Sequence, residues 1–149
     1  MSHSVPTTSG RGQRLVLKLR AGEKMLVNGA ALQFQTSASV VLSNRARFLF
    51  GRQILAPDEA RTPARRLYFA MQAAYVCDEA ERASYIRFAR DLAHEYSEAT
   101  TSPRIRAVLD EAMEELERDR CWEAMRIVRD LFVHDDLMLA DAPAQGHPA

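Results

Sequence analysis

The sequence has few of the residues that mark secreted, low-complexity or membrane proteins. Its 149 residues include two cysteines, Cys77 and Cys121, which is too few for a disulfide framework, so the cytoplasm is the expected location. Six Gly and six Pro exclude a low-complexity chain. No apolar run approaches the roughly 18 residues of a membrane helix, and no apolar core of a secretory signal lies near the start. We therefore expect a globular protein without a membrane partner.

Motifs of catalysis and cofactor binding are also missing. The four histidines show no His-Glu-x-x-His spacing, and the cysteines form no metal-binding pair. There is no glycine-rich phosphate loop and no nucleophile elbow. Asp135 and Asp136 follow His134 and resemble a metal cluster, but a solvated helix end is the simpler interpretation. The sequence thus predicts no enzyme, no metal and no cofactor, and both cysteines are interpreted as packing residues.

A net charge of zero hides a strong division of charge along the chain. Residues 1–66 contain eleven Lys or Arg and three Asp or Glu, a net of +8, whereas residues 67–149 contain nine and seventeen, a net of −8. Such asymmetry is typical of a basic half that meets an anionic partner. Eighteen of the twenty cations are Arg, which binds phosphate in a bidentate manner. A GC-rich genome would explain the same arginine preference equally well.

Apolar periodicity predicts an α+β fold. Residues 1–13 are interpreted as a disordered arm and residues 14–60 as a small antiparallel β-module. Leu15, Leu17 and Leu19 alternate with other side chains, as in a strand with one apolar face. Asn28-Gly29 is a strong hairpin signal. Further short strands are expected at 39–42, 47–50 and 54–55, which makes six in all.

The second half has helical periodicity. Residues 62–140 are predicted to form an acidic bundle of about four helices, followed by a disordered tail at 141–149. Thr62-Pro63 and Ser102-Pro103 are typical helix starts, because Thr and Ser cap and Pro fits the first turn. Tyr85, Phe88, Leu92 and Tyr96 share one face of the second predicted helix. We expect that face to be core.

The remaining chemistry is binding. The candidate RNA contacts are the cations of the basic half and of the first predicted helix: Lys18, Arg20, Lys24, Arg45, Arg47, Arg65 and Arg66. Phe48 and Phe50 are either base-stacking rings or core. Arg65 and Arg66 have a structural alternative, an ion-paired seam that joins the basic module to the acidic bundle. A second hypothesis gives the bundle a protein partner, bound by exposed members of the stripe Trp122, Met125 and Phe132.

Two segments resemble a known family. The sequence LKLRAGEKMLVNGA at 17–30 resembles the N-terminus of the FlbT family of alphaproteobacterial flagellin regulators, and TPARRLYF at 62–69 resembles its second signature. The resemblance covers about residues 14–140. It implies a post-transcriptional regulator that binds the 5′ untranslated region of flagellin mRNA and represses translation or promotes decay, although some relatives activate. It also implies that the protein works alongside FlaF, a small helical protein. Under the second hypothesis, the partner bound by the bundle is flagellin, a flagellin paralogue or FlaF.

A weaker similarity concerns the first strand. LVLKLRAGE at 15–23 is similar to the opening strand and turn of CsrA-type RNA regulators, where basic residues of that strand contact RNA. Arg20 matches the second of two family arginines, whereas Leu19 stands in place of the first. The similarity implies a CsrA-like β-module and a homodimer formed through it, as an analogy of fold.

Overall fold

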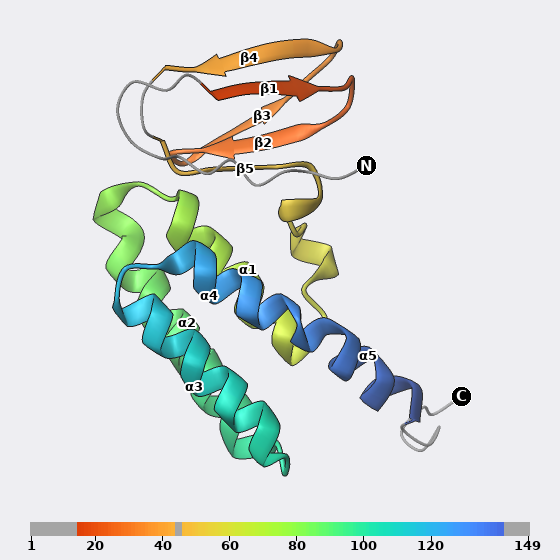
Figure 1. Ribbon diagram of the computed structural model, residues 1–149, viewed down its shortest axis with the longest axis vertical. Helices are drawn as coiled ribbons and strands as arrows, with labels where there is room; N and C mark the ends of the chain where they lie inside the picture. Colours follow the sequence, from red (N-terminus) through yellow and green to blue (C-terminus); the bar gives the residue numbers. More distant parts are fainter. Residues whose placement is uncertain (1–14, 44–45, 142–149) are drawn as a thin grey trace. The chain divides into compact units, whose positions relative to one another are not determined.

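The computed structural model describes residues 15–43 and 46–141 (Figure 1). The chain folds as two compact units, residues 1–54 and 55–149. The first unit contains antiparallel strands and the second contains α-helices, so the α+β class is confirmed.

Unit 1 consists of five strands in its described part. Two of them form one sheet, and the other three form a second sheet in the order β3-β2-β5, with antiparallel pairing throughout. The strands are β1 (Leu15–Leu19), β2 (Lys24–Val27), β3 (Ala30–Gln33), β4 (Ala38–Leu42) and β5 (Phe48–Phe50), and β1 pairs with β4. The connection between β2 and β3 is the predicted Asn28-Gly29 turn. Both residues have positive φ, 46° and 86°, which matches the twist of the flanking strands.

The core of unit 1 is apolar and joins the two sheets. Leu17 and Leu19 of β1 cluster with Met25 of β2 and with Phe48 and Phe50 of β5. The two phenylalanine rings stack on each other with their centroids 6.2 Å apart, and both side chains are buried. The interpretation of these rings as base-stacking groups is therefore wrong. Residues 48 and 50 face the same side of β5, and that side is the core.

The sixth predicted strand, at Ile54 and Leu55, does not form. Two short 3₁₀ turns, η1 (Gly51–Gln53) and η2 (Pro57–Glu59), flank it. Leu55 instead pairs with a side chain: its N–H donates to Oε1 of Gln72 at 2.7 Å, and its carbonyl accepts from Nε2 at 2.9 Å. The buried Gln72 amide thus satisfies the backbone groups that a neighbouring strand would otherwise satisfy.

Unit 2 is helical. Its helices are α1 (Pro63–Val76), α2 (Glu79–Ala99), α3 (Pro103–Glu117), α4 (Cys121–Arg129) and α5 (Leu131–Asp141). Thr62 and Ser102 cap α1 and α3 as expected, since each hydroxyl accepts the N–H of the residue three positions on. The last predicted helix is divided at Asp130. Its N–H donates to the carbonyl of Ile127, a bond that tightens the final turn of α4 before α5 begins.

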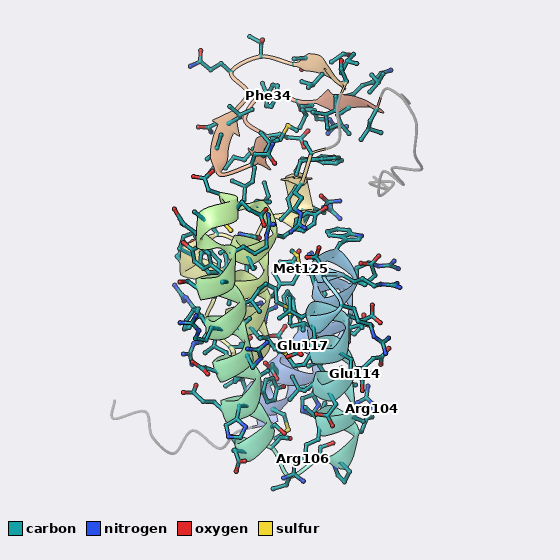
Figure 2. All side chains as sticks on the ribbon, turned by 90° about the vertical axis from the view of Figure 1, so that its left-hand side faces the viewer. Phe34, Arg104, Arg106, Glu114, Glu117 and Met125 are labelled. Atoms are coloured by element: carbon teal, nitrogen blue, oxygen red, sulfur yellow. The ribbon has the colours of Figure 1, made fainter. Side chains whose placement is uncertain are left out.

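Alanines bring α2 close to its neighbours. Ala89 and Ala93 are buried together with Leu92 and Tyr96, whereas Phe88 is 50% exposed. The prediction that Phe88 belongs to the core is wrong, because the narrow alanine face takes the buried positions on that part of the helix. Met125 of α4 is fully buried and lies inside unit 2 (Figure 2).

Candidate nucleic-acid interface

The basic side chains of unit 1 surround the connection between β1 and β2. Lys18 and Lys24 are both exposed, and no described carboxylate forms an ion pair with either. Lys18 is opposite Ser39 on β4, and Lys24 is opposite Gln33 on β3. Residues 1–54 contain eight Lys or Arg and one acidic residue, Glu23, a net of +7. Unit 1 therefore presents cations with very little negative charge of its own.

The two lysines face different directions. Side chains alternate along a strand, and Leu17 and Met25 both point into the shared core. Lys18, next to Leu17, therefore projects from the outer face of the β1–β4 sheet. Lys24, next to Met25, projects from the outer face of the other sheet. The β1–β2 connection joins the two strands that carry these lysines.

That connection is a fixed turn. The N–H of Arg20 donates to Oε1 of Glu23 at 2.8 Å, and the N–H of Glu23 donates to the carbonyl of Arg20 at 3.1 Å. Gly22 has φ of +87° and donates to the carbonyl of Phe34 at 2.6 Å. The one acidic residue of unit 1 is therefore used to shape the turn that carries the exposed Arg20.

The other predicted cations of this half differ in environment. Arg47 is half-buried, and its carbonyl accepts the N–H of Asn28 at 3.2 Å. Arg45 lies outside the described residues. The candidate interface is thus built around Lys18, Arg20 and Lys24, with Arg47 contributing less exposed surface.

Arg65 has a structural contact within unit 2. Its guanidinium donates two hydrogen bonds to the carboxylate of Asp136 on α5, at 2.7 and 3.0 Å, and lies 4.7 Å from the ring centre of Phe132. The hydrogen bond from Arg65 lowers the pKa of the Asp136 carboxyl. The described partners of the Arg65 side chain, Thr62, Asp136 and Phe132, all belong to unit 2, so this contact is not a seam between the β-module and the bundle. An RNA contact by Arg65 stays a prediction. The neighbouring Arg66 is exposed.

Asp135 anchors three helices. Its side chain is 6% exposed and accepts the N–H of Ala64, in the first turn of α1, at 2.7 Å. It also accepts the hydroxyl of Tyr96 on α2 in a short hydrogen bond. Burial raises the pKa of Tyr96, and the bond to the carboxylate raises it further. The interpretation of this pair as a solvated helix end is wrong for Asp135, and a partner 71 residues away left no local signal in the sequence.

Comparison with known proteins identifies the family of this chain. A family model described as flagellar protein FlbT matches residues 15–139. The chain belongs to the FlbT family. A probable flagellum biosynthesis repressor protein FlbT from Brucella anthropi is 31% identical over 129 residues, 85% of this chain and 84% of the relative. Proteins of the same name from Brucella ovis and Brucella canis are 46% identical over 56 residues, 38% of this chain and 37% of theirs. No solved structure matches.

FlbT membership groups the chain with flagellar regulators rather than with enzymes. The resemblance read from the two sequence motifs is confirmed at the level of the family. The likeness of residues 15–23 to CsrA-type regulators gains no support from these comparisons. The expected homodimer stays a prediction.

The second FlbT-like motif, residues 62–69, has a structural explanation here. Thr62 caps α1, Pro63 opens it, Ala64 donates its N–H to Asp135, and Arg65 binds Asp136. The motif therefore holds α5 against the start of α1. In addition to these hydrogen bonds, the two carboxylates interact favourably with the positive end of the α1 dipole.

The predicted partner stripe, Trp122, Met125 and Phe132, is largely packed inside unit 2. Met125 is fully buried, so it offers no surface to a partner. Trp122 is half-buried with its ring 6.1 Å from that of Tyr75, and Phe132 is half-buried with its ring 5.4 Å from that of Tyr68. Partner binding by the partly exposed Trp122 and Phe132 stays a prediction.

Two classes of site are absent from the described residues. Within 15–43 and 46–141, no three His, Cys, Asp or Glu side chains come together as metal ligands. In the same ranges, no helix combines the length and the apolar character needed to span a membrane.

Proposed function

We propose that this protein represses flagellin synthesis after transcription, by binding the 5′ untranslated region of flagellin mRNA through unit 1. The observation that carries the proposal is the pair of exposed lysines, Lys18 and Lys24, which flank the fixed β1–β2 turn and have no described acidic partner. The names of the Brucella relatives, flagellum biosynthesis repressors, support the regulatory part. Binding to mRNA also requires the protein to be in the cytoplasm.

The chemistry of unit 1 favours backbone contacts over base reading. The aromatic rings of β5 lie in the core, so they do not stack on bases. Lys18, Arg20 and Lys24 supply charge on both outer faces around one turn. A single strand or a hairpin loop that wraps this turn would lose counterions at each phosphate it places near a cation. Affinity should then depend strongly on salt.

The test uses a fluorescently labelled flagellin leader transcript and the full-length protein. Lys18→Glu combined with Lys24→Glu should weaken binding by about tenfold or more at low salt, and should reduce the salt slope by about 0.7 for each lost phosphate contact. Fluorescence anisotropy over a salt series measures both quantities.

The matched control is Arg87→Glu with Arg104→Glu, two exposed arginines on α2 and α3. It changes the net charge by the same amount on unit 2 and should leave the affinity within about twofold. Equal weakening by the two double variants would mean that total charge and not unit 1 attracts the RNA. Unchanged binding by the lysine variant would overturn the proposal.

The alternative is a protein-interaction module that binds flagellin or FlaF and acts on RNA only indirectly. The partial exposure of Trp122 and Phe132 favours it. Capture of purified flagellin by a protein that fails to bind leader RNA would favour this alternative.

A further inference from the structure

Exposed apolar side chains gather on α5. Eight large hydrophobic residues are exposed in the described chain. Four of them lie in one seven-residue stretch of this helix: Val133, Leu137, Met138 and Leu139. Each of these side chains is at least 60% exposed. Scattered exposed apolar residues need no explanation, but a cluster of this kind is typical of an interaction surface.

Three of the four residues, Leu137, Met138 and Leu139, belong to the half of α5 that is not anchored. In the first half, Leu131 and Asp135 are buried and Asp136 binds Arg65. From Leu137 to Ala140 every side chain is exposed. The helix therefore continues past the last residue by which unit 2 holds it.

The exposed turn is apolar on all sides. Successive helical residues are separated by about 100°, so Leu137, Met138 and Leu139 point in three different directions. A helix turn that is apolar all round is stable when it is buried and unfavourable when it faces water. We therefore expect another helix to cover this end of α5.

The charge of the residues around α5 indicates which kind of helix would cover it. Residues 130–149 contain four Asp and neither Lys nor Arg. Asp135 and Asp136 are satisfied within unit 2, whereas Asp130 and Asp141 stand at the two ends of α5. A second copy of α5 would bring like charges together in either direction of pairing. A partner helix with cations at both ends of its apolar stripe would instead complement them.

We propose that Val133 and residues 137–140 dock an amphipathic helix of another protein that carries Lys or Arg on both sides of an apolar stripe. This surface is made of unit 2 residues only and includes neither Lys18 nor Lys24, so the proposal does not rest on the proposed RNA contact. The recognition mode is a helix packed on a helix, with leucine-type anchors and charged flanks.

The probe is a fluorescent helical peptide of about 18 residues with a leucine stripe and lysine flanks. Full-length protein should bind it in fluorescence anisotropy. Leu137→Ser with Leu139→Ser should weaken binding by about tenfold or more, because two anchors lose their buried apolar surface. Both positions are exposed, so helix content should be unchanged by circular dichroism. The matched control, Phe88→Ser, removes an exposed ring from α2 and should bind as the wild type does.

Two further peptides and one measurement decide the outcome. A peptide with glutamate flanks should bind at least about tenfold more weakly, and a peptide with a dispersed stripe should not bind. Equal binding of the three peptides, or full binding by the serine variant, would overturn the proposal. Sedimentation tests the remaining alternative, self-association. A dimeric wild type together with a monomeric serine variant would assign the surface to a second copy. Leader-RNA affinity should be the same for wild type and serine variant.

Discussion

Three arginines of unit 2 and the two lysines of unit 1 have different environments. In unit 2, Arg65, Arg90 and Arg120 each pair with a carboxylate, of Asp136, Glu117 and Glu115, at 2.7 to 2.8 Å. Glu117 lies on α3 among exposed acidic and basic side chains (Figure 2). In unit 1, Lys18 and Lys24 are exposed without a described acidic partner. Arginines thus form ion pairs between segments of unit 2, whereas the two lysines of unit 1 are exposed to solvent.

The difference shows how a charge count relates to function. Arg65 and Arg66 stand side by side and were equivalent as sequence candidates. Asp136 comes from α5 and binds only the first of them, because Arg65 faces α5 and Arg66 faces solvent. A cation is available to a ligand only where the fold brings no acid to it, and that depends on contacts distant in sequence.

Asp135→Ala should have the largest effect on stability. The change removes the acceptor of the buried Ala64 N–H and of the Tyr96 hydroxyl, and each buried donor without a partner costs about 1–3 kcal/mol. We expect the free energy of unfolding to fall by about 3 kcal/mol in urea, followed by the helical circular dichroism signal. Tyr96→Phe, which removes one donor with its acceptor left in place, should cost less.

A loss below about 1 kcal/mol for Asp135→Ala would contradict the anchoring role. Asp136→Ala is the neighbouring control. Its side chain is about half exposed, so the change should be clearly smaller than that at Asp135.

Gln72→Ala should have the second largest effect. The side chain satisfies both the N–H and the carbonyl of Leu55, which is buried at the start of unit 2. The loss of both bonds should cost about 2 kcal/mol in the same urea measurement. Gln72→Glu separates the two bonds, since the carboxylate can still accept from the N–H but cannot donate to the carbonyl. Equal stability of wild type and alanine variant would exclude this link.

Local signals predicted much of this fold. Alternating leucines, Asn28-Gly29, Thr62-Pro63 and Ser102-Pro103 gave the first strand, the hairpin and two helix starts, since each depends on residues within one turn. The errors came from long-range contacts. The strand predicted at 54–55 does not form, because Gln72 supplies the hydrogen bonds of Leu55. Phe88 has the spacing of a core residue, but the neighbouring alanines occupy the buried face of α2.

The candidate site was predicted unevenly for the same reason. The exposure of Lys18 follows from strand alternation with Leu17 and Leu19, which is a local property. The ion pair of Arg65 could not be predicted locally, because its partner Asp136 is 71 residues away. The exposed end of α5 was missed because its hydrophobic residues suggest a core helix, and only the fold shows that they are exposed in the described part of unit 2.

Charge reversal tests the comparison between units directly. Arg65→Glu should lower the free energy of unfolding by about 1–2 kcal/mol, because the guanidinium leaves the Phe132 ring and a new carboxylate faces Asp136. Lys18→Glu should change it by less than about 0.5 kcal/mol, since that exposed side chain has no described ionic contact. Equal destabilisation by both variants would mean that Lys18 has a structural role, and the contrast between the two units would then fail.

The smallest effect should be a dependence of stability on pH that comes from Asp136. The hydrogen bond from Arg65 lowers the folded-state pKa of this carboxyl below its unfolded value of about 3.9. A lowered folded-state pKa means that the stabilisation is fully present above the unfolded pKa and is lost as pH falls through the folded pKa. Urea unfolding at pH 6 down to about pH 3 should therefore show a steeper decline for the wild type than for Asp136→Asn, because only the wild type takes up this proton on unfolding. Parallel curves for the two proteins would show that the ion pair with Arg65 adds nothing beyond solvation of the two groups.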